Sequence, residues 1–231
     1  MPFSKIGVVV ADNGEFYPFA EAIDKKEKPD TPFKDAVRFC IGDTEVTAVL
    51  SGIGKVNAAS AAMFLADGGC DLILNFGLSG GLKGVSRGEF ILPDSFLEHD
   101  FDLTVFGYKP CEKPGQTYIY KADREVISAF CAAAGARITS AAVCGDRFIN
   151  DRQSRNYFIR EFSASSCDME TAAVASVCHI TKIPFACLRR ISDDASEGAQ
   201  DSYGEMNTSE GETLAEVFLK CLASVCAVSR S

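Results

Sequence analysis

The sequence predicts an α/β fold in a single domain, residues 1–231, and three observations support this prediction. Short apolar runs rich in β-branched residues alternate with longer, mostly Ala-rich runs of helical period. The strand-like runs are apolar on both faces, which is typical of parallel strands covered by helices. Hydrophobic residues make up 47% of 231 residues, enough for one sizeable core.

The expected strands are short, and most are bounded by Gly, Pro or acidic residues. In chain order they are KIGVVVAD (5–12), EVTAVLSG (45–52), DLILNFGL (71–78), EFILPDSF (89–96), SAAVCGD (140–146) and PFACLRRISD (184–193). The N-terminal segment has one lysine and a short apolar run before acidic residues and Gly14, so we interpret this run as a strand and not as a signal peptide.

The expected helices are longer and carry apolar residues at helical spacing. They are GKVNAASAAMFLADGG (54–69), DREVISAFCAAAGA (123–136), RQSRNYFIREF (152–162), METAAVASVCHI (169–180) and SEGETLAEVFLKCLASVCAV (209–228). Residues 99–121, with Gly, Pro and aromatic side chains, are expected to form the longest loop. No repeat or linker interrupts the pattern.

Composition excludes several classes of protein. The net charge is −9 with a pI near 4.8, so no basic surface indicates a nucleic acid or an anionic membrane as partner. No apolar run reaches the roughly 20 residues of a membrane span. The ten cysteines include no CxxC pair, and His99 and His179 are the only histidines. We therefore expect reduced, structural cysteines, no metal site and a cytoplasmic protein.

Polar residues follow several of the expected strands. Glu15 follows the first strand, glycines end the second and third, and Ser192 and Asp193 end the last. Ligands of open α/β sheets bind outside the carboxyl ends of the strands, so these residues are expected to converge on one site. The turns SGIGKV (51–56) and GLSGGLKG (77–84) match neither dinucleotide nor NTP motifs, and tight turns explain their glycines as well as a phosphate site does.

Each acidic candidate has a functional and a purely structural interpretation. Glu15 is either a general base or a first-turn helix acid, and Asp193 is either a general acid or a cap. Asp168 fits the start of a helix. Glu170 fits that interpretation less well, because its two oxygens match the spacing of vicinal ribose hydroxyls and Met169 beside it suits a sugar face.

Five motifs carry a resemblance to a known family over essentially the whole chain. They are SGIGKV (51–56), HDFDLTVFGY…PG (99–108 and 114–115), GDRFIND (145–151), DMETAAVASVCH (168–179) and LRRISD (188–193). Together they resemble the bacterial 5′-methylthioadenosine/S-adenosylhomocysteine nucleosidases of the nucleoside phosphorylase superfamily. The resemblance implies a central mixed sheet partly closed into a barrel, flanked by helices as three layers α/β/α, in a homodimer that uses no metal and no cofactor.

The resemblance also implies site residues. Glu15 would activate water, Asp193 would protonate the adenine, and Arg189 and Ser192 would support these two. Residues implied to bind the substrate are Ile53, Leu78, Ser79, Gly80, Phe148, Ile149, Cys167, Met169, Glu170 and Tyr203. Leu103, Phe106 and Pro114 would enter the neighbouring subunit's pocket. Leu78 departs from the hydroxyl usual in the family.

Alternative functions stay open at this point. A futalosine hydrolase or another purine nucleosidase would use the same three carboxylates. A nucleoside phosphorylase would need cations for phosphate, and residues 75–81 contain no arginine. A nucleoside-binding sensor without catalysis would not need to keep Glu15, Glu170 and Asp193 together. Hydrolysis of 5′-methylthioadenosine and S-adenosylhomocysteine is the preferred prediction.

Overall fold

A computed structural model describes residues 3–209 and 211–227 of the chain. The first part alternates strands and helices: β1 (Lys5–Val10), α1 (Asn13–Glu21), β2 (Asp35–Ile41), β3 (Thr44–Leu50), α2 (Lys55–Asp67) and β4 (Leu72–Gly81). The middle contains β5 (Phe90–Pro93), β6 (Ser95–Glu98), a 3-10 turn (Thr104–Phe106), β7 (Tyr120–Lys121), α3 (Arg124–Ala134), β8 (Arg137–Thr139) and β9 (Ala142–Cys144). The last part contains α4 (Arg152–Phe162), β10 (Ser166–Asp168), α5 (Thr171–Thr181), β11 (Phe185–Asp193), α6 (Ala199–Ser209) and α7 (Gly211–Ala227).

One mixed sheet runs through the molecule and branches at β4. On one side of β4 the order is β1, β3 and β2; beyond it lie β10, β9, β6 and β7, and β11 leads to β5 and β8. The pairs β1–β3, β1–β4 and β4–β11 are parallel, whereas β10 and β2 each pair antiparallel with their neighbours β4 and β3. The predicted mixed-sheet α/β fold is confirmed. The partial closure into a barrel that the resemblance implied is not found, because no pairing among the described strands joins the ends of the sheet.

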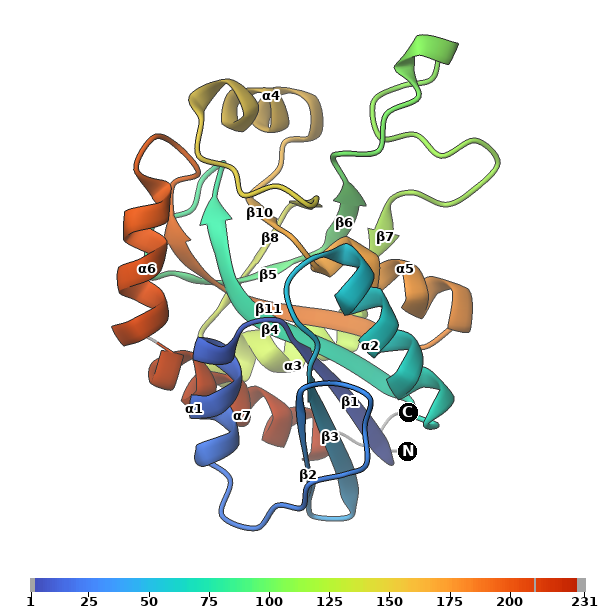
Figure 1. Cartoon of the computed structure of the whole chain (residues 1–231), viewed down its shortest axis with the longest axis vertical. Coiled ribbons are helices and arrows are strands. Elements are labelled where there is room, and N and C mark those ends of the chain that lie inside the picture. Colours follow the sequence, from blue (N-terminus) through green and yellow to red (C-terminus); the bar gives the residue numbers. More distant parts are fainter. Residues whose placement is uncertain (1–2, 210, 228–231) are drawn as a thin grey trace.

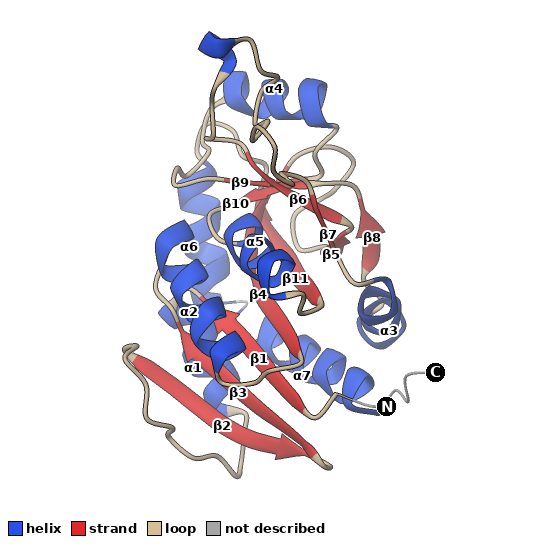
Figure 2. Cartoon of the chain, turned by 90° about the vertical axis from the view of Figure 1, so that its right-hand side faces the viewer, coloured by secondary structure: helices blue, strands red, loops and turns tan. Residues whose placement is uncertain are grey.

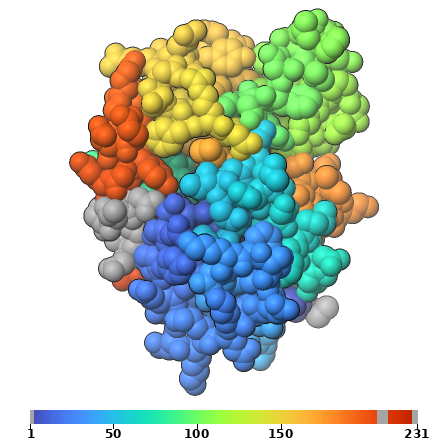
Figure 3. All heavy atoms as spheres, in the orientation of Figure 1, coloured from blue at the N-terminus to red at the C-terminus, as the bar shows by residue number. Residues whose placement is uncertain are grey.

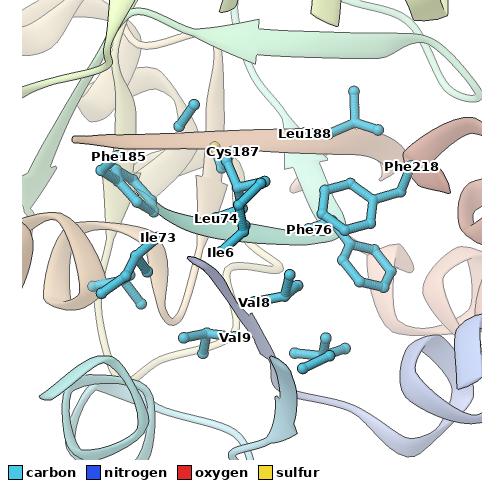
Figure 4. Packing of buried hydrophobic residues seen from close by; sticks show 14 of the residues in the cluster. Ile6, Val8, Val9, Ile73, Leu74, Phe76, Phe185, Cys187, Leu188 and Phe218 are labelled. Atoms are coloured by element: carbon cyan, nitrogen blue, oxygen red, sulfur yellow. The ribbon is translucent and has the colours of Figure 1, made fainter. Parts of the chain in front are cut away.

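Helices cover the sheet on both faces. On one face α2 packs against α5 and β1, and on the other α7 packs against α1 and α3 (Figures 1 and 2). Apolar side chains of the strands supply the core between these layers: Figure 4 shows side chains of β1, β4 and β11 converging with Phe218 of α7. The Phe76 and Phe218 rings stack with centroids 4.2 Å apart. This packing holds the ends of β1, β4 and β11 in register.

Sequence reasoning went wrong in the segment 89–96, which was predicted to be one strand. The structure divides it into β5 and β6, which pair with different strands. Pro93 has no N–H for a ladder, and the Asp94 N–H donates to the Thr139 carbonyl at 3.0 Å, so the chain changes partners there. The predicted strand 140–146 is shorter, with β8 before it.

Further elements differ from the sequence prediction. The strands β2, β7 and β10 and the helices α1 and α6 were not among the expected elements, and the C-terminal helix was predicted over 209–228. The structure has α7 at Gly211–Ala227, while Glu210 and Val228 of that prediction lie outside the described residues. The expected loop 99–121 contains the 3-10 turn and ends in β7; it projects from the body of the molecule as the green segment in Figure 1.

All ten cysteines are free thiols, and most are buried. Within residues 3–209 and 211–227, no helix has the length and apolar character needed to cross a membrane.

Candidate active site

A cavity of about 410 Å³ opens at the carboxyl ends of β1, β4 and β11. It lies on the face seen in Figure 3, which is hollowed beside the yellow segment that precedes α4. Its lining comes from segments far apart in the sequence: Ala11, Asp12, Glu15, Ile53, Leu78, Ser79, Gly80, Arg147, Phe148, Ile149, Cys167, Asp168, Met169, Glu170, Arg189, Asp193, Gln200 and Tyr203. Every residue predicted for one subunit's pocket is in this set except Ser192, which is buried behind Asp193.

Glu15 lies in the first turn of α1, a helix that was not among the expected elements. Asp12 caps this helix by accepting a hydrogen bond from the Gly14 N–H at 2.7 Å. The turn directs the Glu15 side chain inward: it is 5% exposed, and its Oε1 accepts a hydrogen bond from the Leu78 N–H at 2.7 Å. Burial raises the pKa of Glu15 to about 8, although the Leu78 N–H and the charge of Arg189 oppose the rise. Glu15 therefore titrates near neutral pH.

Gly77 lets two charged side chains meet beside β4. A Cβ at this position would lie 2.5 Å from Arg189 Nη1 and 2.8 Å from Glu15 Oε1. Any larger residue would displace one of these groups. The need for glycine thus comes from close packing, because Gly77 is outside the group of glycines with positive φ.

Arg189 projects from β11 and is 2% exposed. Its Nη2 donates to Asn75 Oδ1, and its Nε lies 3.6 Å from Asp168 Oδ2, an ion pair without a hydrogen bond. Burial alone would lower the pKa of Arg189, but the surrounding negative charges, Asp168 foremost, raise it above its ordinary value. The guanidinium is therefore a permanent cation beside Glu15, and Asp168 balances its charge.

Glu170 stands at the start of α5 without capping it. Asp168 performs that task instead: its Oδ1 accepts the Glu170 and Thr171 N–H groups at 2.9 and 2.8 Å, and its Oδ2 accepts from the Thr171 hydroxyl. The Glu170 carboxyl turns into the cavity, where its Oε1 accepts the Gly54 N–H at 2.8 Å. Burial, reinforced by the charge of Asp168, raises the pKa of Glu170 to about 7.

Asp193 ends β11 at a bulge. The β4–β11 register pairs Ile191 with Ser79 and Asp193 with Gly80, so Ser192 is the extra residue. The Ser192 hydroxyl donates to Asp193 Oδ2 at 2.7 Å, and the Ala195 N–H donates to Oδ1 at 2.8 Å. Burial raises the pKa of Asp193 above its ordinary value despite these two hydrogen bonds. The bulge thus aims a carboxyl of raised pKa into the cavity.

The remaining wall is aromatic and polar. The Phe148 and Tyr203 rings meet edge to face with centroids 5.7 Å apart. The hydroxyl of Ser79 is buried and has no hydrogen-bond partner among the described residues, which leaves it available to a ligand. Leu78 contributes its N–H to Glu15 and its side chain to the lining.

Three predicted residues lie outside this cavity. Leu103, Phe106 and Pro114 belong to the projecting segment 99–121, where Phe106 is 74% exposed. They had been predicted to enter a neighbouring subunit's pocket, and in the single chain they do not line the chain's own cavity.

Sequence reasoning did not assign Ala11, Asp12, Asp168 or Gln200 to the site. Only Asp168 carried a signal, through its place in the DMET motif, and it was interpreted as a helix-start acid, which its hydrogen bonds support. Arg147 also lines the cavity without having been assigned to it, and its Nη2 lies 2.8 Å from Asp151 Oδ2. Gln200 lies on α6, a helix that was not predicted.

Comparisons with known proteins agree with this architecture. The model of the Phosphorylase superfamily matches residues 5–225. A 5′-methylthioadenosine/S-adenosylhomocysteine nucleosidase of Exiguobacterium sp. is 34% identical over 174 residues, which cover 71% of this chain and 74% of the relative. One of Geobacillus sp. is 29% identical, covering 96% of this chain and 99% of the relative.

A solved structure gives the same result. The Streptococcus pneumoniae 5′-methylthioadenosine/S-adenosylhomocysteine nucleosidase with a transition-state inhibitor superposes with a TM-score of 0.88 at 26% identity, covering 95% of this chain and 99% of that one. The predicted resemblance is confirmed: the chain belongs to the phosphorylase superfamily and, within it, to the family of 5′-methylthioadenosine/S-adenosylhomocysteine nucleosidases.

Proposed function

We propose that the chain hydrolyses the N-glycosidic bond of 5′-methylthioadenosine and S-adenosylhomocysteine, releasing adenine and the 5-thioribose product. The observation that carries the proposal is the meeting of Glu15, Glu170 and Asp193 in one cavity of about 410 Å³. These carboxyls come from three separate elements, and burial raises the pKa of each. Buried acids of raised pKa in one pocket are typical of acid–base catalysis.

Glu15 acts as the general base. It takes a proton from water while the water oxygen attacks C1′ of the ribose. A base is most effective when its pKa lies near the working pH, and the pKa of Glu15 is about 8. The Leu78 N–H and the Arg189 charge favour its ionised form.

Glu170 binds the sugar. Its carboxylate accepts hydrogen bonds from the 2′- and 3′-hydroxyls, and Met169 lies along the sugar face. The Gly54 N–H already holds Oε1, so the side chain is oriented before substrate arrives.

Asp193 is the general acid. As the C1′–N9 bond breaks, its proton passes to N7 of the adenine, which leaves as a neutral base. Ser192 holds Oδ2 at 2.7 Å and thereby orients the carboxyl. Phe148 stacks on the purine, with Ile149 and Cys167 beside it.

Water is the preferred nucleophile, and phosphate is not. Phosphate would need spare positive charge next to C1′. Arg189 is the buried cation in that region, and it already faces the carboxyl groups of Asp168 and Glu15. Ionised Glu15 would in addition repel an incoming anion.

The active form is a homodimer in which the segment carrying Leu103, Phe106 and Pro114 completes the partner's 5′-alkylthio pocket. The exposure of Val105 (85%) and Phe106 (74%) at the tip of this segment supports the proposal, because large exposed apolar side chains favour an interface. Sedimentation should give a dimer at micromolar concentration; a fully active monomer would contradict it.

The test of the function is release of the free purine base from a panel of three nucleosides: adenine from 5′-methylthioadenosine and S-adenosylhomocysteine, and hypoxanthine from futalosine. The expected order places futalosine last. If only futalosine were hydrolysed, the chain would instead be a futalosine hydrolase. No release from any of the three would refute nucleoside hydrolysis.

The variant Asp193→Asn, assayed on two substrates, distinguishes loss of general-acid catalysis from misfolding. Loss of general-acid catalysis should cost about 10²–10⁴ in rate on adenine nucleosides, or roughly 3–5.5 kcal/mol of barrier. A nitrophenyl riboside, whose leaving group needs no proton, should keep most of its rate. Equal losses on both substrates would remove Asp193 from this role.

A further inference from the structure

Arg87 lies in the loop between β4 and β5 and reaches two parts of the cavity wall with one guanidinium. Its Nε donates to the Ser192 carbonyl at 3.0 Å. Its Nη2 donates to the Ser202 carbonyl at 3.3 Å and to Glu205 Oε2 at 3.0 Å. The first contact is on β11 and the other two are on α6.

The β11 contact holds the bulge that aims Asp193. Ser192 is the extra residue of this bulge, and its hydroxyl donates to Asp193 Oδ2 while its carbonyl accepts from Arg87. A change in the Ser192 peptide would therefore move the partner that orients the Asp193 carboxyl.

The two contacts on α6 lie on either side of Tyr203, which forms part of the aromatic wall of the cavity. Ser202 and Glu205 flank Tyr203, whose ring meets Phe148. Apolar packing holds this helix weakly, since Ala199 and Met206 are its only fully buried residues between 199 and 206. A hydrogen-bonded tie consequently matters more here than on an amphipathic helix with a full apolar face.

We propose that Arg87 is a positioning residue that ties the end of β11 to α6, so that Asp193 and the Phe148–Tyr203 wall are held relative to each other by one side chain. The inference rests on the proposed function of Asp193 as the general acid. It adds a residue that touches neither substrate nor reacting atoms.

Charge supports the same assignment. The groups that act on Asp193 are Ser192, the Ala195 N–H, Asp194, Arg87 and the Cys167 thiol on β10. Burial raises the pKa of Asp193, and the positive charge of Arg87 opposes that rise. Removing the charge should raise the Asp193 pKa further, and a purely structural brace far from the acid would not do so.

The loop should keep its path without this side chain. The Gly88 N–H donates to the Ile191 carbonyl at 2.7 Å, and the Ile191 N–H donates to the Glu89 carbonyl at 3.0 Å. Two backbone hydrogen bonds thus hold the loop on β11 independently of the guanidinium, and Arg87→Gln is expected to fold.

The experiment compares three variants of the full chain. Arg87→Gln removes the tie and the charge, whereas Glu205→Gln weakens one of the two α6 contacts and leaves the contact with β11 in place. Arg137→Gln is the matched control, because the hydrogen bonds of Arg137 go to Glu89 and to the Gly84 carbonyl, both in the same loop.

Hydrogen exchange and a carboxyl titration provide readouts that need no activity. In the ligand-free protein, the backbone amides of residues 199–206 should exchange about three- to tenfold faster in Arg87→Gln than in wild type. This factor is what the loss of one partly exposed, charge-assisted hydrogen bond would cause. The ¹³C carboxyl titration of Asp193, assigned with Asp193→Asn, should move to higher pH in Arg87→Gln and stay in place in Glu205→Gln. Arg137→Gln should change neither.

Kinetics complete the test. Arg87→Gln should raise KM for the adenine nucleoside about three- to tenfold and lower kcat, with part of both restored in Arg87→Lys. Unchanged exchange of residues 199–206 together with an unmoved Asp193 titration would overturn the inference. If wild-type protein released no adenine, the proposed function would fail while the exchange and titration results still decided the role of Arg87.

Discussion

Glu15→Gln should make the protein more stable at neutral pH while it abolishes hydrolysis. The Glu15 side chain is 5% exposed, and burial raises its pKa to about 8 from 4.5. Glutamine has the same shape and can still accept the Leu78 N–H through its carbonyl oxygen. The substitution therefore removes the titration with little change in packing.

The sign of the effect follows from the two pKa values. Between 4.5 and about 8 the unfolded chain releases this proton while the folded protein keeps it, so wild-type stability falls as the pH rises. The full difference corresponds to about 5 kcal/mol at 1.36 kcal/mol per pKa unit, an upper limit for a site that relaxes. Over the interval from about pH 5 to about pH 7.5, the expected gain of the variant over wild type is about 2–3 kcal/mol.

Urea unfolding of the ligand-free proteins at several pH values measures this difference. Glu170 titrates in both proteins, with a pKa of about 7, so its contribution largely cancels in the comparison. The two stability curves should lie close together near pH 5 and separate steadily toward pH 8. Parallel curves would mean that Glu15 is already ionised at neutral pH, and the reasoning from burial would then be refuted.

Three other predictions concern the same cavity. Gly77→Ala should destabilise the protein by about 1–3 kcal/mol and reduce activity, because its Cβ would lie 2.5 Å from Arg189 Nη1; Gly204→Ala, which has open space, serves as the control in urea unfolding. Glu170→Gln should slow hydrolysis of ribosides about 10–100-fold and affect 2′,3′-dideoxy analogues much less, as measured by adenine release. The rate should not respond to inorganic phosphate, and a ribose 1-phosphate product would contradict the choice of water as nucleophile.

Much of the sheet could be predicted from local patterns. The strands β1, β3, β4 and β11 are buried on both faces, and their short, mainly apolar runs identified them. The helix α6 was not predicted, because a polar helix lacks the apolar stripe by which a helix is recognised in a sequence. The division of residues 89–96 into two strands was not predicted, because it depends on which strands pair with β5 and with β6. That pairing is a property of the sheet as a whole.

In the candidate site, too, residues marked by a local sequence pattern could be predicted, and residues whose role depends on distant contacts could not. Glu15, Glu170 and Asp193 could be identified because each interrupts or ends an apolar run. Gly77 could not, since its role depends on the register that sets it opposite Arg189 in the β4–β11 pair. Arg87 carries no signal at all in the sequence, because its partners, two carbonyls and one carboxylate, lie more than 100 positions away.

Two carboxylates stand at the buried start of α5 because they divide two tasks that one carboxylate could not perform together. Asp168 accepts the N–H groups that begin the helix and faces Arg189, so its oxygens are engaged within the protein. Glu170 is thereby released from capping, and its carboxyl turns into the cavity with the Gly54 N–H on one oxygen. The arrangement also places a negative charge next to Glu170, which adds to the rise of its pKa to about 7. Binding a diol, which supplies two hydrogen-bond donors, favours the ionised form and offsets that rise. Burial, reinforced by the charge on Asp168, therefore keeps Glu170 partly protonated in the free pocket near neutral pH, and on its proposed role the substrate would complete its ionisation.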